Sequence, residues 1–342
     1  MSWTIAVVGA TGTVGQEILN VLAEREIEGL EVVALASRKS MGVEVSFGDR
    51  IIKCRDIAQH DFSATAITIM STDAATAKEW APKIATAGSV VIDTSTAFRM
   101  DPSVPLIVPE VNAHALERYS KKNIVAVASG VVSQRLAVLK PLHDEARITR
   151  VVATSLQSVS GAGKDAMDEL FTQTRAIFVG DQVERHALPK QIAFNVIPQV
   201  GDVAEDGSTT EEASQITEMR KILDPDIKLS VTSVRVPVFV GDSEACMIEF
   251  ERPISVQKAK GVLREAPGLI LIDRREDGAY VTPVETVGDF ATYVSRVRKD
   301  PSVANGLMLW ITSDNLRKGA ALNAVQIAET LMAKHLKRRI AT

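Results

Sequence analysis

The hydrophobic pattern at the start of the chain predicts a strand, a helix and a second strand. Residues 4–8 form a nearly continuous apolar run, which is typical of a parallel strand covered on both faces. Between residues 14 and 26, apolar side chains recur at helical spacing, with charged side chains on the opposite side. A second apolar run covers residues 32–36. This order predicts the opening of a βαβ unit.

A glycine-rich turn lies directly between this first strand and the helix. Glycines let the backbone approach a pyrophosphate bound at the helix N-terminus, so the context favours dinucleotide binding over a structural turn. We therefore predict a Rossmann-type parallel sheet. The candidate cofactor residues in the turn are Gly9, Thr11, Gly12, Thr13, Val14 and Gly15.

The end of the second strand indicates which nicotinamide cofactor would bind. Where an acidic residue would accept the ribose hydroxyls of NAD, the chain has Ser37, Arg38, Lys39 and Ser40. Basic and hydroxyl side chains suit a 2′-phosphate, which favours NADP. The alternative is an exposed, solvated loop of charges.

Further apolar runs extend the predicted sheet. They cover residues 66–70, 89–92 and 107–108, with helical patterns between them. Arg99 lies in the loop after the 89–92 strand, at the carboxyl end where open α/β sheets bind ligands. It is therefore a candidate anion clamp, and the alternative is an ordinary surface arginine.

The stretch from residue 121 to residue 141 has a pattern that suits a catalytic nucleophile. An apolar strand leads through Ala128, Ser129 and Gly130 into a helix with leucines at helical spacing. Residue 130 is thus predicted at a helix N-terminus, where the dipole lowers a thiol pKa and backbone N–H groups stabilise an oxyanion. Because residue 130 is glycine, this position has no nucleophile.

A second domain is predicted after Pro141, because the strand-like runs 150–156, 227–240 and 246–250 alternate with helices. We predict a second α+β domain with a largely antiparallel sheet. The predicted boundaries are residues 1–133, completed by a C-terminal helix at 314–342, for the Rossmann domain. Residues 134–313 form the second domain.

Two features of the second domain are candidates for ligand contacts. The turn at 157–164, which includes Gln157 and Gly161, joins a strand to a helix and suits a phosphate or carboxylate, or is only a flexible turn. Arg235 lies in a strongly apolar setting. A buried arginine needs an anionic partner, and the sequence leaves open whether this is a ligand or a protein carboxylate.

Composition narrows the class of partner. The formal net charge of -4 gives no field for nucleic acid or anionic lipid, so we expect a small-molecule site. No run of the sequence is apolar enough to predict a membrane span, and no leader pattern precedes the first strand. Two cysteines and five scattered histidines predict no disulfide framework and no metal site, and they fit a cytoplasmic protein.

Motifs along nearly the whole chain resemble those of the bacterial aspartate-semialdehyde dehydrogenases. They include VVGATGTVG at 7–15, VPEVN at 108–112, QSVSGAG at 157–163, RVPV at 235–238 and DNLRKGAALNA at 314–324. The resemblance implies a Rossmann domain with an α+β partner domain, and a homodimer or tetramer. It also implies reduction of aspartyl phosphate by NADPH through a thioester on a cysteine.

The resemblance also implies roles for individual residues. Arg99 falls on a phosphate-binding arginine, Gln157 on the active-site glutamine, Glu212 on a substrate-binding glutamate and Arg235 on the arginine for the substrate carboxylate. A small anionic, amino-acid-like ligand is therefore expected. The residues expected to hold the cofactor are the glycine loop with Arg38, Gly161 and Asn315 of the C-terminal motif.

Four departures from the family pattern fall at the chemistry. The family's nucleophilic cysteine aligns with Gly130, and the asparagine before it with Ser129. The acid/base histidine aligns with Asp242, and a basic phosphate-binding residue with Ser214. The nucleophile, its proton-transfer partner and part of the anion clamp are thus all replaced, while the scaffold and glycine loop are kept.

Three interpretations follow. The first is a non-catalytic paralogue that binds NADP(H), with weakened affinity as one possibility. The second is an NADP-dependent oxidoreductase that passes hydride directly to a small oxo acid without a thioester. The third is a functional aspartate-semialdehyde dehydrogenase whose site has been altered or engineered, or which uses Cys246, four residues beyond Asp242 on the same strand face, as a displaced thiol.

Overall fold

The computed structural model describes residues 3–336 and divides into two compact units. Unit 1 comprises residues up to Ser129 together with those from Ala320 onward, and unit 2 comprises Gly130–Gly319. The boundaries therefore lie at 129/130 and 319/320 instead of at the predicted 133/134 and 313/314. The difference matters because it places all of the helix that starts at residue 130 in unit 2.

Unit 1 contains a seven-stranded sheet in which every pairing is parallel, as the unbroken apolar runs predicted. The strand order is β5-β2-β1-β6-β7-β9-β8. Its strands are β1 (Trp3–Val8), β2 (Leu30–Ala36), β5 (Arg55–Asp56), β6 (Ile67–Met70), β7 (Val90–Asp93), β8 (Leu106–Ile107) and β9 (Ile124–Val127). A separate hairpin consists of β3 (Glu44–Phe47) and β4 (Arg50–Lys53).

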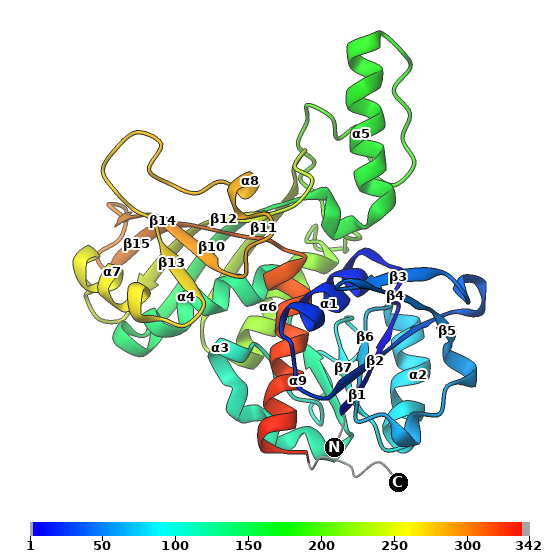
Figure 1. Cartoon of the computed structure of the whole chain (residues 1–342). Helices are drawn as coiled ribbons and strands as arrows, with labels where there is room; N and C mark the ends of the chain where they lie inside the picture. The colour runs from blue at the N-terminus through cyan, green and yellow to red at the C-terminus, as the bar shows by residue number, and fades with distance from the viewer. Residues whose placement is uncertain (1–2, 337–342) are drawn as a thin grey trace. The chain divides into compact units, whose positions relative to one another are not determined.

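The helices of unit 1 cover this sheet. They are α1 (Thr13–Glu24), α2 (Ala74–Thr86), α3 (Pro109–Asn112) and α9 (Asn323–Lys334). The C-terminal helix α9 returns to unit 1 and packs beside α1 and against β7 (Figure 1). The basic residues that were predicted to complement its C-terminus begin with Lys334 in the last turn, and residues 337–339 lie outside the described residues.

Unit 2 contains a six-stranded sheet in the order β11-β10-β12-β15-β14-β13. Its strands are β10 (Ile148–Gln157), β11 (Lys228–Arg235), β12 (Asp242–Phe250), β13 (Leu269–Leu271), β14 (Thr292–Lys299) and β15 (Gly306–Ser313). The central pairings are antiparallel, but β10–β11 and β13–β14 are parallel. The sheet is therefore mixed, with most of its pairings antiparallel as predicted and with a parallel pair at each edge.

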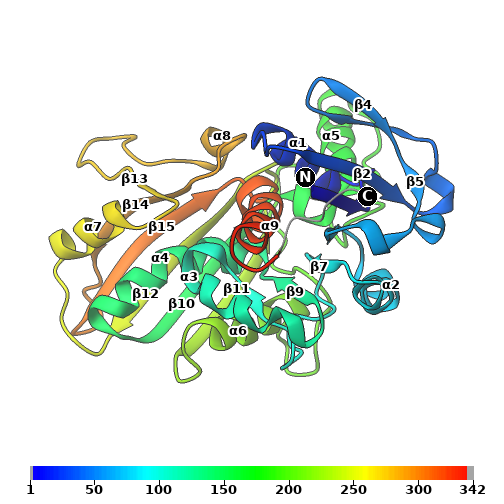
Figure 2. The same cartoon turned by 60° about the horizontal axis from the view of Figure 1, so that its bottom comes forward.

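The helices of unit 2 are α4 (Gly130–Ala146), α5 (Lys164–Val179), α6 (Thr210–Ile222), α7 (Val256–Glu265) and α8 (Pro283–Thr286). Helices α4, α6 and α7 pack on one face of the sheet (Figures 1 and 2). Helix α5 stands away from the sheet with its own small core beneath it (Figure 1).

Across residues 3–336, none of the helices combines the length and the apolar character that a bilayer span requires.

Candidate active site

Gly130 is the first residue of α4 and follows β9 after two residues, as the sequence predicted. A side-chain carbon built on Gly130 would lie 3.1 Å from the Cα of Gly319 and 3.6 Å from the carbonyl oxygen of Asn315. Gly319 belongs to a π-helical turn, Arg317–Leu322, a form that occurs often at functional sites. The predicted position at the start of α4 is therefore present, and the backbone of Gly319 fills the space beside residue 130.

Gln157 ends β10 and faces the first turn of α6. Its Nε2 donates to the Oε1 of Glu211 at 3.3 Å and to the Oγ of Ser155 at 3.3 Å. Only 5% of Gln157 is exposed, so its amide lies in a polar region that is nearly closed to solvent. The structure thus pairs the predicted glutamine with Glu211.

Glu212, the predicted substrate-binding glutamate, has a structural role instead. Its Oε2 accepts from the backbone N of Thr209 at 2.8 Å, completing a capping box, and its Oε1 accepts from the N of Ser233 at 2.8 Å. Both oxygens are therefore used within the fold. The spacing from Thr209 to Glu212 is a capping-box signature in the sequence, and this signal could have indicated Glu212 as a cap and Glu211 as the candidate.

Arg235 ends β11 and is 6% exposed. Its Nη1 donates to the carbonyl oxygen of Ser158 at 2.6 Å. Burial lowers the pKa of the guanidinium, and the charges of Asp242 and Glu211 act in the opposite direction. Within residues 3–336 no carboxylate comes within the 4.0 Å of an ion pair with Arg235. Its cationic head therefore retains capacity for an anionic ligand.

Gly161 permits the position of that guanidinium. A side-chain carbon at residue 161 would lie 3.1 Å from the Nη1 of Arg235, which is closer than most real contacts of this kind. The predicted cofactor residue Gly161 therefore lies directly beside Arg235.

Asp242 opens β12 and is 5% exposed. Its Oδ1 accepts from the backbone N of Ser158 at 2.8 Å and from the Ser158 Oγ at 3.0 Å. Burial raises the pKa of this carboxyl to about 6, although the Ser158 hydrogen bonds and the charge of Arg235 oppose the shift. Residue 242 thus carries a group that exchanges a proton near neutral pH.

Asn315 connects the residue before β12 to the turn that follows β10. Its Oδ1 accepts from the N of Gly241 at 2.9 Å and from the Ser158 Oγ at 3.0 Å, and its Nδ2 donates to the Ser160 Oγ at 2.9 Å. The structure therefore brings Gln157, Gly161, Arg235, Asp242 and Asn315 together within unit 2. The Oδ1 of Asp314, beside it, accepts from the N of Leu316 and of Arg317.

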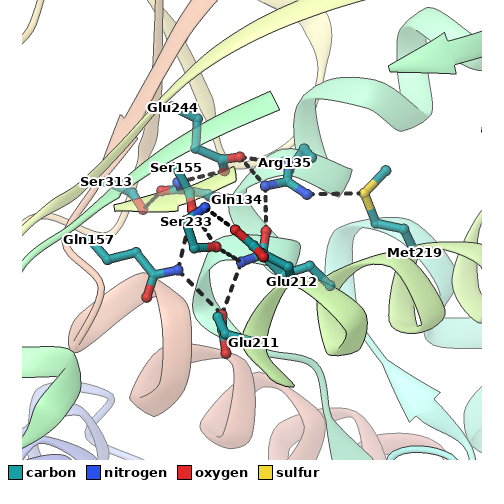
Figure 3. A network of polar contacts seen from close by, with 11 residues as sticks. Gln134, Arg135, Ser155, Gln157, Glu211, Glu212, Met219, Ser233, Glu244 and Ser313 are labelled. Carbon is teal, nitrogen blue, oxygen red and sulfur yellow. Dashed lines mark hydrogen bonds and ion pairs between the residues drawn. The ribbon is translucent and has the colours of Figure 1, made fainter. Parts of the chain in front are cut away.

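A fully buried network behind these residues was not predicted (Figure 3). Arg135, from α4, donates through Nε to the Oε2 of Glu244 at 2.6 Å and through Nη2 to the Oε1 of Gln215 at 2.7 Å. Gln215 in turn donates to the Oε1 of Glu211 at 3.1 Å. The network therefore connects the nucleophile helix to the residue that faces Gln157. The sequence signal for this network was a single arginine, Arg135, inside an apolar helical pattern.

The two cysteines are poor nucleophiles in this structure. Cys246 lies on the same face of β12 as Asp242 and Glu244, as predicted, but only 1% of it is exposed. Burial, and secondarily the charge of Glu244, raises the pKa of its thiol. Cys54 is buried in unit 1, where burial also raises its pKa. Neither thiol is set to form a thiolate.

Ser214 and Ser129, which were predicted to depart from the family pattern, carry hydroxyls. The Oγ of Ser214 donates to the Oε1 of Glu218 at 2.7 Å, so it takes part in the packing of α6. Ser129 is the residue immediately before α4 and ends the first part of unit 1.

Arg99 lies in unit 1, at the carboxyl ends of the parallel strands. Its Nε donates to the carbonyl oxygen of Val127 at 3.0 Å, and its Nη2 donates to that of Thr94 at 2.9 Å. These contacts hold the guanidinium at the ligand-binding edge of the sheet and leave it 9% exposed.

The glycine loop has the form of a phosphate cradle. Gly9 has φ of 81°, and a side-chain carbon there would lie 2.1 Å from the carbonyl oxygen of Ser71. A side-chain carbon on Gly15 would lie 2.1 Å from the carbonyl oxygen of Gly9, so both positions require glycine. Gly12 caps α1 without a side-chain hydrogen bond, and no acidic residue lies in the first turn. The helix N-terminus therefore suits a pyrophosphate.

The predicted adenosine end of the cradle follows β2. Ser37 precedes a short 3-10 helix that contains Arg38 and Ser40, and Arg38 is exposed. These residues fit a 2′-phosphate in charge and hydrogen-bonding capacity.

Comparisons with known proteins agree with this arrangement. The family model of the semialdehyde dehydrogenase NAD-binding domain matches residues 4–119, and that of the semialdehyde dehydrogenase dimerisation domain matches residues 139–318. The aspartate-semialdehyde dehydrogenase of Rickettsia conorii is 47% identical, covering 98% of this chain and 99% of that protein.

Two solved structures show the same fold. Aspartate semialdehyde dehydrogenase II of Vibrio cholerae, complexed with ASA, is 39% identical with a TM-score of 0.95, covering 98% of this chain and 100% of that one. The enzyme of Candida albicans with NADP is 22% identical with a TM-score of 0.75, covering 97% and 98%, and supports the fold alone.

The environment of Asp242 predicts a pH-dependent stability. Because the folded-state pKa is raised, the fold favours the protonated carboxyl, and the free energy of unfolding falls as pH rises through about 6. Asp242→Asn mimics the protonated form. It should stabilise the protein by up to about 3 kcal/mol at pH 7.5 and by about half as much at pH 5, measured by urea denaturation. Asp226→Asn, at an exposed position between α6 and β11, is the control. An Asp242→Asn effect of equal size at both pH values would contradict the assignment.

Proposed function

The chain belongs to the aspartate-semialdehyde dehydrogenase family, and we propose that it has kept the nicotinamide-nucleotide site of that family but not the thioester step. The observation that carries this proposal is Gly130 at the first position of α4. A thioester needs a thiolate at a helix N-terminus, and here the Gly319 backbone lies 3.1 Å from where a side chain would begin.

Among residues 3–336, we propose that no other group takes the place of that nucleophile. Cys246 is buried with a raised pKa, and Ser133, on the first turn of α4, is fully buried. A serine without an imidazole to accept its proton is a far weaker nucleophile than a thiolate. Loss of nucleophile and base together removes many orders of magnitude of rate in comparable enzymes.

NADP is the cofactor we propose for unit 1. The N-terminus of α1 and the glycine loop would hold the pyrophosphate, and Arg38 with Ser37 and Ser40 would hold the 2′-phosphate. When bound, this cofactor supplies a hydride donor or acceptor. We further propose that the protein works in the cytoplasm, because both of its cysteines are unpaired and buried.

A second candidate function rests on Asp242. Direct reduction of a carbonyl requires a hydride at the carbon and a proton at the oxygen, but no thiol. With a pKa of about 6, the Asp242 carboxyl is a suitable proton donor near neutral pH. Arg235, which lacks a protein ion pair, would hold the carboxylate of a small oxo acid, and Gln157 would orient it. This would be an NADP-dependent reduction of a small, anionic, amino-acid-like oxo acid.

The first prediction concerns turnover. Purified protein with aspartate semialdehyde, phosphate and NADP should form no NADPH above background, and Cys246→Ala should not change this result. NADPH production is followed by absorbance. Turnover that Cys246→Ala abolishes would contradict the proposal and identify the buried thiol as the nucleophile. A panel of small oxo acids with NADPH then tests the second candidate, which requires that Asp242→Asn lose any activity found.

Restoration is the sharper form of this test. Gly130→Cys combined with Asp242→His should give measurable NADPH formation, since it returns a nucleophile and a base to positions that are already formed. The Gly319 backbone must move by a few tenths of an ångström to admit the new Cβ. Gly261→Cys, on the open surface of α7, is the matched control for adding a thiol. If the double variant is folded but inactive, residues other than these two must also be missing for the thioester reaction.

Cofactor choice gives the next prediction. Arg38→Gln should weaken NADPH binding about 10- to 100-fold, because one charge-assisted contact to the 2′-phosphate is lost. NADH affinity should not change, and Lys78→Gln, on the exposed side of α2, should leave both affinities unchanged. Fluorescence titration measures all of these constants. Equal loss for both cofactors would mean that Arg38 supports the loop and does not read the phosphate.

A homodimer is the assembly we propose. Helix α5 and the segment that packs on it expose Phe171, Phe178 and Phe194, at 60%, 76% and 66%. The rings of Phe178 and Phe194 meet edge to face at 5.7 Å, so they form one continuous apolar surface. The family domain that contains them is described as a dimerisation domain. We propose that a second copy of the chain covers this surface.

This arrangement predicts that Phe178→Asp shifts the protein toward monomer, because a charge would be buried in the interface. Light scattering at micromolar concentration measures the mass. Val284→Asp, an equally exposed apolar position on α8, is the matched control and should leave the mass unchanged. A Phe178→Asp protein with the mass of the wild type would place the interface elsewhere.

A further inference from the structure

A cavity of about 980 Å³ lies in unit 2, among residues that the proposed reaction does not use. It is bounded by α7, by the end of β14 and by the loop from residue 272 to residue 282, which leaves the sheet as a wide arch between β13 and α8 (Figure 1). Six cationic and three acidic side chains line it. The cations are Lys260, Arg274, Arg275, Arg296, Arg298 and Lys299.

Asp273 anchors the arch to the sheet. Its Oδ1 accepts from the backbone N of Arg296 at 3.1 Å and its Oδ2 from the N of Val297 at 3.2 Å. The same Oδ2 lies 2.6 Å from the Nζ of Lys260, and both side chains of this pair are largely shielded from solvent. At its other end the arch is held by Val281, whose backbone N donates to the Ser295 Oγ at 3.2 Å. The walls of the cavity are therefore tied to rigid elements.

Arg296 is held in an unusual backbone conformation. Its φ is 57°, in the left-handed region that arginine rarely adopts, and it lies in an irregularity of β14 where the register with β15 shifts between Ser295 and Arg298. Bulges of this kind redirect a side chain at sheet edges and binding sites. The Asp273 carboxylate stabilises the distortion by accepting from two successive backbone N–H groups. The result is that Arg296 lines the cavity.

Most of the cationic charge has no protein counter-charge. Among residues 3–336, Arg274, Arg275, Arg296 and Lys299 form no ion pair within 4.0 Å, and Asp273 is already used by Lys260. The two remaining acids, Glu276 and Asp277, are exposed on the arch. A group of unpaired cations around one cavity, in a chain of formal net charge -4, creates a local positive field that attracts an anion.

Tyr280 adds an aromatic surface to the same cavity. It lines the far end of the arch and is 42% exposed, so its ring is available for stacking. The volume is at the upper end of the range for small-molecule sites, large enough for a ligand that carries two phosphates and a ring system.

We propose that this cavity binds a diphosphate-bearing small molecule at a site separate from the candidate active site. The guanidinium groups of Arg274, Arg275 and Arg296 hold the phosphates, since their geometry suits bidentate contacts to phosphate oxygens. Tyr280 contacts the organic part of the ligand where one is present. The site belongs to unit 2 alone and does not depend on the proposed function.

Calorimetry with inorganic pyrophosphate and with ADP tests this assignment, in excess NADP so that the glycine loop of unit 1 is filled. Both probes should bind the wild-type protein, and affinity should fall as salt is raised. Arg275→Gln combined with Arg296→Asn should weaken both at least about tenfold, because two charge-assisted contacts are lost. Asparagine tolerates the left-handed backbone at residue 296, so the fold is kept.

Arg264→Gln is the matched control, since it removes the same charge from an exposed position on α7 that does not line the cavity. It should leave both affinities unchanged. If ADP binds more tightly than pyrophosphate and Tyr280→Leu removes only that difference, the ligand is a nucleotide; equal binding identifies the phosphates as the whole determinant. Absence of binding to the wild type, or equal binding to the double arginine variant, would overturn the proposal.

Discussion

The candidate site depends on the close approach of two glycines, Gly130 at the start of α4 and Gly319 in the π-helical turn. A side-chain carbon on Gly319 would lie 2.8 Å from the Cα of Gly130, so the two backbones can meet only if residue 319 has no side chain. This contact sets the position of the helix N-terminus relative to Asn315. Asn315 in turn holds Ser158 and Gly241, and thereby the start of β12, where Asp242 lies. The positions of Gly130, Asn315 and Asp242 therefore depend on one backbone contact.

The buried Arg135–Glu244 pair supports the same site from behind. Both side chains have 0% exposure; Gln134 donates to Glu244, and Arg135 also donates to the Gln215 amide oxygen and to the sulfur of Met219. Removing one partner of such a pair typically costs about 3–5 kcal/mol, because the other charge stays buried. The free-energy cost of burying the pair is offset only when its polar atoms all have hydrogen-bond partners. Here the network ends at Glu211 and Gln157, so its rigidity is transmitted to two groups that face the ligand region.

Local signals predicted much of this fold, and the failures have a common cause. Unbroken apolar runs and the glycine turn predicted the parallel sheet, and the leucine spacing predicted the helix at Gly130. The parallel pairing of β10 with β11 depends on contacts between segments about 80 residues apart, which no local pattern records. Assigning Glu212 a ligand role was an error of the same kind, because the choice between adjacent glutamates depends on which one the Ser233 backbone meets. Arg135 was missed because its partners come from α6 and β12.

In the proposed function, residues 130 and 242 have unequal chemical consequences. Glycine at 130 offers only backbone, so acyl transfer to a side chain has no starting point there. Aspartate at 242 is ionisable, and burial brings its pKa to about 6, within the range where proton transfer is useful. The carboxylate also contributes a favourable charge to Arg235, whose pKa burial would otherwise lower further. The groups that remain can still hold an anion and exchange a proton. The proposal therefore assigns to this site chemistry that needs only those two capacities, and not chemistry that needs a covalent intermediate.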